Sequence, residues 1–211
     1  MKNYFPDHSL VFVDFAGFGE SCEPNKPFFV ADYVIELFDL ISKFDVQDLV
    51  LVGHSFGGRV AIKFACYFQH EFNKFKLCLV DSAGMKPKRG FLYYLKVKKF
   101  KRLKRKAQRN SKLQPKLLKY GSSDYKKLSP LMKQTFVNVV NENLELNAKY
   151  IKAQTLIVWG EKDKETKLFM ARRLKKLIKN SKLEIIKNAG HFSYLDSPQE
   201  FLILLDTFIK N

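Results

Sequence analysis

The pentapeptide GHSFG at residues 53–57 places Ser55 between two glycines in the pattern G-x-S-x-G. An apolar run precedes it and a segment with helical periodicity follows it. A strand that turns into a helix within so few residues forces the serine into a strained backbone conformation and exposes its hydroxyl. Gly53 and Gly57 remove side chains expected to clash in such a turn, and the helix N-terminus favours negative charge. The pattern therefore indicates a nucleophile, and the alternative is an ordinary N-cap serine.

A serine hydroxyl is a weak nucleophile at neutral pH, so it needs a base that is itself oriented by an acid. Among the four histidines, His8 lies near the N-terminus and His70 at a polar helix end. His54 lies inside the turn, with its side chain expected to point away. His191, in NAGHFSYLDSP, follows the last predicted strand, from which a loop can reach Ser55. His191 is therefore the candidate base.

Three carboxylates are candidates for the acid, and all lie in VWGEKDKET after the fourth predicted strand: Glu161, Asp163 and Glu165. Asp163 lies three residues beyond the turn at Gly160, on the sheet edge where the serine and the histidine are also expected. This spacing favours Asp163 over Glu161. An acid at the start of a helix could equally be a cap.

Five short apolar runs predict the strands that must hold these side chains. They are nearly continuous in Val, Leu and Ile, which is typical of parallel strands covered on both faces. Apolar stripes at helical spacing over residues 61–68, 174–178 and 201–208 predict covering helices. The alternation predicts an α/β fold with a mostly parallel sheet of about five strands and helices on both faces. The predicted strands are residues 9–15, 48–54, 75–83, 154–160 and 182–188.

Residues 85–149 interrupt this alternation because they contain no strand-like run. We interpret them as an inserted, basic helical lid, which leaves residues 1–84 and 150–211 as the core. A second lid helix is predicted after Ser129-Pro130. The first lid helix is expected to carry one apolar stripe, made of Tyr93, Val97, Phe100 and Ala107.

The formal net charge of +17 is concentrated in this lid. Residues 86–119 contain 15 Lys or Arg and no Asp or Glu, which leaves 23 basic against 21 acidic residues elsewhere. Three interpretations stay open: a solvated lid helix, weak attachment to an anionic membrane surface, and nucleic-acid binding. We do not expect nucleic acid, because the chain has no recognised binding motif and basic runs alone are blind to sequence.

The remaining composition favours a cytoplasmic protein without a metal or organic cofactor. No apolar stretch approaches the length of a membrane span, and the N-terminus lacks the features of a signal peptide. The three cysteines, Cys22, Cys66 and Cys78, have no metal-binding spacing. Cys66 and Cys78 lie in apolar segments, so we expect buried free thiols.

Four segments together resemble the motifs of the α/β-hydrolase fold family. DFAGFGES resembles its D-x-P-G-x-G-x-S loop, LVGHSFGG its nucleophile elbow, LIVWGEKD its acid turn and NAGHFSYLDSPQEF its histidine loop and final helix. The resemblance implies that Ser55 is the nucleophile, Asp163 the acid and His191 the base, with the Phe56 amide in the oxyanion hole. It also implies hydrolysis of a small carboxylic ester or related acyl compound.

Lids of this family shape the acyl pocket, so the resemblance implies Phe91, Tyr94 and Phe100 as pocket walls. The family also has about three strands before the DFAGFGES position and a His-Gly loop that supplies the second oxyanion donor. This chain starts a few residues before that position and contains no His-Gly dipeptide. The resemblance therefore predicts an N-terminally truncated sheet.

Truncation would leave several interpretations open. The chain is either a working minimal hydrolase, an impaired fragment with half of its oxyanion hole, or a basic membrane- or nucleic-acid-binding module. If residues 9–15 pair with residues 48–54, the amide of Ala16 or Gly17 could become the second donor. If they do not pair, both segments expose unpaired edges.

Overall fold

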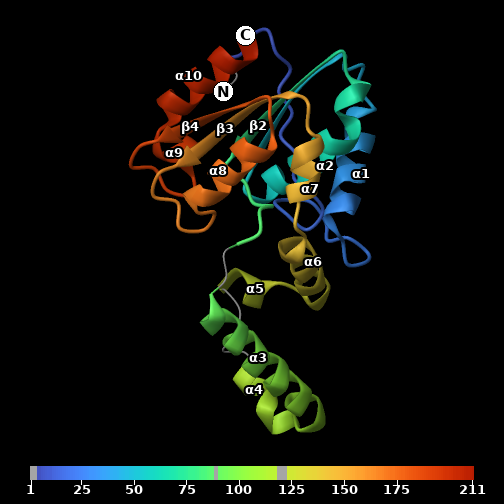
Figure 1. The fold of residues 1–211 in the computed structure, drawn as a ribbon. Helices are drawn as coiled ribbons and strands as arrows, with labels where there is room; N and C mark the ends of the chain where they lie inside the picture. Colours follow the sequence, from blue (N-terminus) through green and yellow to red (C-terminus); the bar gives the residue numbers. More distant parts are fainter. Residues whose placement is uncertain (1–3, 88–89, 118–122) are drawn as a thin grey trace.

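The computed structural model describes residues 4–87, 90–117 and 123–211 (Figure 1). Four strands form one parallel sheet in the order β1-β2-β3-β4. Because the order follows the chain, the carboxyl ends of all four strands meet at one edge, and each crossover passes over a face of the sheet. The strands are β1 Asp48–His54, β2 Lys74–Val80, β3 Gln154–Gly160 and β4 Ser181–Ile186.

The prediction of a fifth strand at residues 9–15 is wrong. These residues have no strand assignment, and the side chains of Val11 and Phe12 are 60% and 77% exposed. A strand exists only where a second strand shares its hydrogen bonds, and β1 pairs with β2 alone among the described residues. The apolar pattern therefore identified an extended segment but not a partner, and β1 is an edge strand with Val52 42% exposed.

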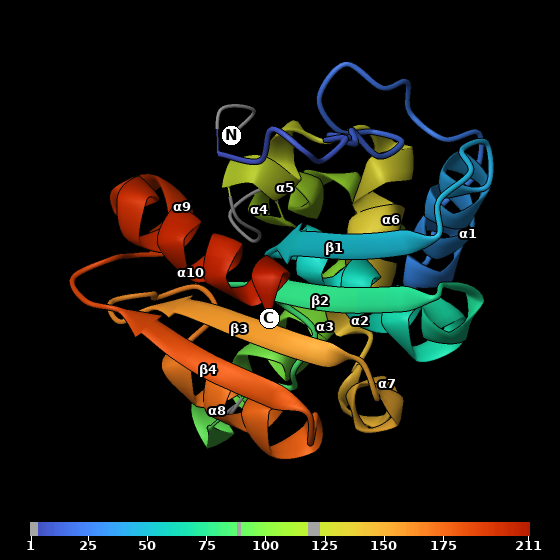
Figure 2. The ribbon, with the colours of Figure 1, turned by 90° about the horizontal axis from the view of Figure 1, so that it is seen from above.

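Helices cover both faces of the sheet, as predicted (Figures 1 and 2). Alternate side chains of β2 explain the two layers, since Leu77 and Leu79 join one apolar cluster while Cys78 and Val80 join the other. The larger cluster lies under α1 Val30–Ile41, α2 Phe56–Phe68, α7 Glu145–Tyr150 and α8 Leu168–Leu177. The smaller one lies under α10 Pro198–Lys210, which α9 Ser193–Asp196 precedes.

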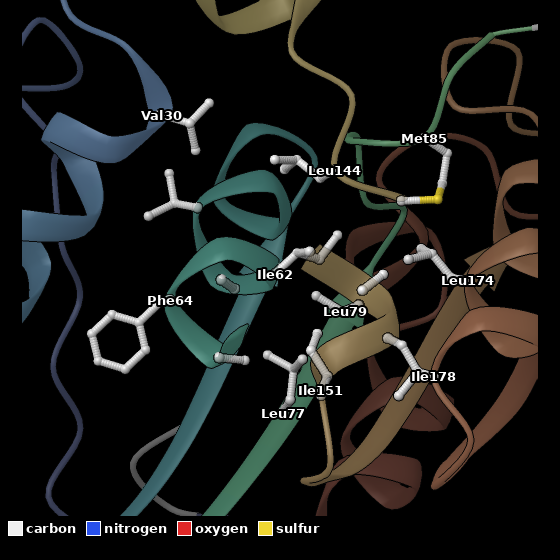
Figure 3. Packing of buried hydrophobic residues seen from close by; sticks show 14 of the residues in the cluster. Val30, Ile62, Phe64, Leu77, Leu79, Met85, Leu144, Ile151, Leu174 and Ile178 are labelled. Carbon is white, nitrogen blue, oxygen red and sulfur yellow. The ribbon is translucent and has the colours of Figure 1, made fainter. Parts of the chain in front are cut away.

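The larger cluster forms the main core between β2, α2 and α8 (Figure 3). In α1, residues 30, 33, 34 and 37 are buried at the spacing of one helix face. Asp32 accepts a 2.7 Å hydrogen bond from the Phe29 amide and so closes the first turn of α1. A short 3-10 turn, η1 Gln69–Glu71, follows α2.

The predicted lid contains five α-helices among its described residues, and they differ in how they pack. The elements are α3 Phe91–Arg109, the 3-10 turn η2 Ser111–Leu113, α4 Gln114–Leu117, α5 Ser123–Lys127, α6 Pro130–Asn141 and α7. In Figure 1, α3 and α4 extend away from the sheet, whereas α6 lies next to the core. Leu144 and Ala148 are fully buried in the main core, so the last part of the predicted lid packs as core.

The structure agrees with the predicted start of α6. Ser129 is its N-cap, and the Ser129 hydroxyl accepts a hydrogen bond from the Met132 amide at 3.1 Å. The Thr135 hydroxyl accepts a hydrogen bond from the Phe28 amide at 3.0 Å, and this bond connects α6 to the segment before α1. No helix in the described part of the chain is long and apolar enough to cross a membrane.

Candidate active site

Ser55 lies on a sharp turn between β1 and α2, as the glycine pattern predicted. Its backbone has φ 47° and ψ −109°, a conformation that residues other than glycine rarely adopt. The Ser55 amide donates to the Val80 carbonyl at 3.1 Å, and the Ser55 carbonyl accepts the Ala83 amide at 3.0 Å. The end of β2 therefore holds the strained turn in place.

The structure reassigns one of the two glycines that sequence analysis placed in this turn. A Cβ at Gly53 would lie 2.6 Å from the Gly57 carbonyl oxygen, so Gly53 is required. A Cβ at Gly57, in contrast, would meet no atom within 4 Å. Gly58 has the tight position instead, because its Cβ would lie 2.2 Å from Ser82 Oγ. The close packing of α2 on the end of β2, and not the turn alone, selects the second glycine.

Ser55 occupies the N-cap position of α2, but its side chain makes no capping hydrogen bond. Its Oγ lies 3.0 Å from His191 Nε2. The capping interpretation therefore does not explain this serine. The next residue, Phe56, begins α2, and the first amides of a helix have no partner within the helix. The Phe56 amide is thus a candidate oxyanion donor next to the Ser55 hydroxyl.

His191 connects Ser55 to Asp163. Its Nδ1 lies 2.9 Å from Asp163 Oδ2, and its side chain is only 9% exposed while that of Asp163 is fully buried. An ionised carboxylate can only accept, so Nδ1 carries the proton. The lone pair of Nε2 then accepts the hydrogen of the Ser55 hydroxyl. The structure brings all three residues together at the carboxyl edge of the sheet.

The other two carboxylates have different surroundings. Glu161 accepts a hydrogen bond from the Asn188 amide at 3.1 Å. Glu165 has a 71% exposed side chain whose Oε2 lies 3.5 Å from His191 Nε2. Asp163 also accepts the Glu165 amide at 2.8 Å, so it stabilises its own turn as well as contacting the imidazole. Asp163 does not cap a helix, because α8 Leu168–Leu177 has Lys167 as its N-cap; the helix-cap interpretation of Asp163 is therefore wrong.

Sequence analysis missed the position of the His54 side chain. It is directed toward the histidine loop, and its Nε2 donates to the carbonyl of His191 at 2.7 Å. Burial lowers the pKa of His54, partly offset by this hydrogen bond, which favours the neutral ring. Its ring centroid lies 5.0 Å from that of His191 and 5.1 Å from that of Tyr194. His54 therefore fixes the backbone that carries the base.

Sequence analysis also missed Asp81, a fully buried residue directly after β2. Its Oδ1 accepts a hydrogen bond from the Gly160 amide at 2.7 Å. Its Oδ2 accepts two hydrogen bonds from Ser193, one from the amide at 3.1 Å and one from the hydroxyl at 2.6 Å. Burial raises the pKa of Asp81, and these three donors partly offset that effect. One side chain thus joins the turn that carries Asp163 to the loop that carries His191.

A signal for Asp81 was present in the sequence. A carboxylate directly after the buried strand KLCLV lies at the edge where parallel sheets bind ligands. No comparable signal marks Thr166, whose hydroxyl donates to Asp163 Oδ2 at 2.6 Å.

The strand pairing on which the second oxyanion donor was conditional does not form, and one of its two expected sources, the Gly17 amide, is already hydrogen-bonded. Residues 9–15 do not pair with β1 in the described structure, and the Gly17 amide donates to the Cys22 carbonyl at 2.9 Å. The loop nevertheless lies beside the elbow, because the rings of Phe18 and Phe56 stack at 4.8 Å. Phe56 remains the one candidate oxyanion donor that we assign among the described residues.

The residues expected as pocket walls lie elsewhere. Phe91 and Tyr94 are 76% and 56% exposed, and Phe100 is half-buried on a helix that Figure 1 shows well away from the sheet. The structure does not bring them to Ser55, since the apolar stripe of α3 packs on η2 and α4. Two other exposed aromatic side chains border the site: Phe18, stacked on Phe56, and Phe192, whose ring centroid is 5.4 Å from that of His191.

Comparisons with known proteins identify the family of the chain. A family model described as alpha/beta hydrolase fold matches residues 2–198. The chain is 26% identical over 219 residues to AB hydrolase superfamily protein YisY of Bacillus subtilis, covering 93% of this chain and 79% of that protein. It is also 26% identical over 193 residues to human monoacylglycerol lipase ABHD6, covering 80% of this chain and 57% of the lipase.

A solved structure shows the same fold. MGS-M2, an alpha/beta hydrolase enzyme from a Medee basin deep-sea metagenome library, superimposes with a TM-score of 0.69 at 19% identity. The superposition covers 94% of this chain and 78% of that chain.

Proposed function

This chain belongs to the alpha/beta hydrolase fold family and is a hydrolase, and we propose that it cleaves a small carboxylic ester or related acyl compound through Ser55, His191 and Asp163. One observation carries the proposal. The serine on the strained elbow lies 3.0 Å from an imidazole whose other nitrogen lies 2.9 Å from a buried carboxylate. This arrangement of groups activates a serine hydroxyl for nucleophilic acyl transfer.

In the proposed reaction, His191 Nε2 takes the proton of the Ser55 hydroxyl as Oγ attacks the carbonyl carbon of the ester. The tetrahedral intermediate collapses, and the leaving alcohol takes that proton from the imidazolium. Water then attacks the acyl-serine, giving one proton to His191. When the ester bond to Oγ breaks, His191 returns the proton to Oγ and the carboxylic acid product leaves.

Two parts of the site would stabilise the charges that develop. The Asp163 carboxylate holds the Nδ1–H tautomer and stabilises the imidazolium. The Phe56 amide at the N-terminus of α2 would donate to the oxyanion.

An ester substrate is supported by the apolar border of the site and by the relatives. Phe18 and Phe192 leave about half of their side chains exposed beside Ser55 and His191, where an acyl chain could contact them. One relative is named a monoacylglycerol lipase, and that name describes an ester-cleaving enzyme. Both observations favour an acyl group of apolar character.

A second candidate function is an impaired hydrolase, and a specific observation favours it. The Gly17 amide, one of the two amides expected as a second donor, already donates to the Cys22 carbonyl, and an oxyanion held by the Phe56 amide alone would be less stable. Loss of one oxyanion donor typically lowers the rate by about 10²–10³-fold. Such a protein would still acylate, but slowly.

A fluorophosphonate probe and an aryl ester test both candidates. We expect the purified protein to be labelled at Ser55 and to turn over p-nitrophenyl acetate, with both signals lost in Ser55→Ala. The matched control is Ser42→Ala, at an exposed serine after α1, which should leave both signals unchanged. Slow but complete labelling would support the impaired form. Absence of labelling in a folded protein would refute both.

The proposal also places the protein in the cytoplasm, where thiols stay reduced. Cys22, Cys66 and Cys78 are free. Burial raises the pKa of the Cys78 thiol to about 12, so this residue is unreactive in the folded protein. Thiol titration of freshly purified, unfolded protein should detect all three groups.

A further inference from the structure

We propose that α3 is a docking surface for an anionic lipid membrane. The surface consists of the exposed apolar residues at the start of α3 and the cations that follow them on its outer side. The proposal goes beyond the proposed hydrolysis and does not depend on it. Four features support it: the division of α3 into two faces, the apolar side chains at one end, the uncompensated charge, and the position of the helix.

The first feature is that the two faces of α3 differ in burial. Val97, Phe100, Leu103 and Ala107 recur at helical spacing, and they are half-buried or buried. This inner face packs on η2 and α4. Residues at positions 91, 95, 98, 102, 105 and 109 follow the opposite side of the helix at spacings of three and four. All six are exposed: Phe91, Leu95, Lys98, Arg102, Arg105 and Arg109.

The second feature is an exposed apolar patch at the start of α3, made of Phe91 and Leu95 on this outer face and of Leu92 and Tyr94 on either side of it. The first turns of α3 expose Phe91 at 76%, Leu92 at 71%, Tyr94 at 56% and Leu95 at 46%. Single exposed apolar residues are ordinary, but four within five positions form a patch. Large apolar and aromatic side chains next to cations are the composition of helices that lie in the membrane interface.

The third feature is charge that nothing nearby in the sequence compensates. Residues 86–119 contain 15 basic and no acidic residues, while the rest of the chain is nearly neutral. An anionic bilayer complements such a surface, and each basic residue close to it raises the affinity roughly fivefold. A nucleic acid would use the cations as well, and its bases could stack on Phe91 and Tyr94, but it would leave Leu92 and Leu95 exposed. The combination therefore favours lipid.

The fourth feature is the position of α3 relative to the candidate site. The chain leaves the sheet at Val80, the carboxyl end of β2, where Ser55 also lies. In Figure 1, α3 and α4 project from this side of the molecule, beyond α6. A membrane bound to α3 would therefore lie on the side of the protein that carries Ser55, His191 and Asp163.

Vesicle flotation tests the surface directly. The protein carries Ser55→Ala so that lipid is not consumed, and vesicles contain either phosphatidylcholine alone or phosphatidylcholine with phosphatidylserine. We expect binding to the anionic vesicles at low salt and much weaker binding to the neutral ones. No binding to anionic vesicles at low salt would overturn the proposal. Binding to a single-stranded oligonucleotide but not to vesicles would also overturn it.

Matched variants separate α3 from net charge. Arg102→Glu/Arg105→Glu should weaken vesicle binding by at least ~25-fold, because each arginine contributes roughly fivefold. Lys176→Glu/Lys179→Glu changes the net charge equally at exposed residues in and just after α8, and should weaken binding far less. Equal losses in the two variants would show that only overall charge matters, and would overturn the assignment to α3.

A third variant tests the apolar patch. Phe91→Ser/Leu95→Ser keeps every charge and should weaken binding by about tenfold or more, with the residual binding abolished by high salt. Unchanged binding would overturn the role of the patch. Each variant is also made with Ser55 restored. Its turnover of a soluble aryl ester then shows whether the variant is folded and active, independently of vesicle binding. Failure of vesicle binding with intact turnover therefore refutes only this inference.

Discussion

The helices α2 and α3 both carry an apolar stripe, but the structure uses them differently. α2 buries seven residues against β1, β2, α1 and α7. α3 is longer, yet Ala107 is the one buried residue among its described side chains. A stripe is thus buried as deeply as its partner surface allows. The sheet and the helices α1 and α7 cover α2, whereas the main contacts of α3 within the described residues are with the short turn η2 and the single helical turn α4.

The difference extends to how each helix begins and what it holds. α2 begins at a strained serine that the end of β2 and the segment just after it hold on both sides. Farther along, Arg59 Nη1 donates to the Glu142 carbonyl at 2.5 Å, which joins α2 to the segment after α6. α3 begins after Gly90 without a side-chain cap. The comparison teaches that the proposed chemistry lies at the start of the buried helix, whereas the proposed membrane contact uses the exposed helix.

The largest expected effect tests whether the chemistry belongs to the α2 side. Asp163→Asn should lower kcat for an aryl ester by about 10⁴-fold, because the amide favours the wrong tautomer of His191. Glu161→Gln is the matched control and should leave kcat unchanged, since Glu161 contacts a backbone amide and not the imidazole. Steady-state kinetics of both variants measure the effect. An equal loss of kcat in the two variants would contradict the assignment of Asp163 as the acid that orients His191.

The second prediction compares the two stripes directly. Phe64→Ala in α2 should lower the free energy of unfolding by about 3–5 kcal/mol, because Phe64 is fully buried. Phe100→Ala in α3 should cost about 1 kcal/mol, because Phe100 is only half-buried. Urea denaturation of both variants provides the measurement. Similar costs would mean that α3 packs far more tightly than the structure indicates.

The third prediction concerns the glycines at the start of α2. Gly58→Ala should lower the free energy of unfolding by about 1–3 kcal/mol, because the new Cβ would meet Ser82 Oγ. Gly57→Ala should be neutral or stabilise by up to about 1 kcal/mol, because its Cβ enters open space and alanine favours the helix. Thermal unfolding distinguishes the two. If Gly57→Ala instead lowered the free energy of unfolding, the open space around Gly57 would be contradicted.

The smallest expected effect concerns Asp81. Asp81→Asn keeps the shape but replaces one acceptor oxygen, so we expect kcat to fall by about tenfold with KM unchanged. Ser193→Ala removes one donor to the same carboxylate and should have a smaller effect of the same kind. A change in KM alone would argue against a role in positioning His191.

The same variant has a pH signature. The pKa of Asp81 is raised above its ordinary 3.8, mainly by burial, so the folded state binds more protons than the unfolded state in the interval above 3.8. The contribution of Asp81 to stability therefore falls as the pH rises through the raised pKa. The stability of the wild type relative to Asp81→Asn should therefore decrease as the pH rises above 3.8, as measured by urea denaturation. A constant difference would contradict the raised pKa.

Much of the site was predictable because its parts are local patterns. The glycines around Ser55 encode a turn, and β1 and β3 have the bounds that their apolar runs predicted. Asp163 and His191 each follow a strand, and parallel strands bring their carboxyl ends to one edge. These inferences need only the neighbouring residues and the alternation of strands with helices.

Other features could not be predicted because they depend on distant partners. Residues 9–15 have the composition of a strand, but only a hydrogen-bonded neighbour makes a strand. Gly58 needs its missing side chain because Ser82 lies against it. Asp81 joins the turn of Asp163 to the loop of His191 because amides from both segments, those of Gly160 and Ser193, donate to its carboxylate.

The sequence by itself determined the order of the four paired strands and their covering helices, the glycine-flanked turn at Ser55 and the concentration of positive charge in residues 86–119, since each is written in adjacent residues. Tertiary structure alone decided which carboxylate faces the imidazole, which glycine is indispensable and which apolar stripe is buried. Those outcomes depend on contacts between residues far apart in the chain, and such contacts exist only after the elements have packed.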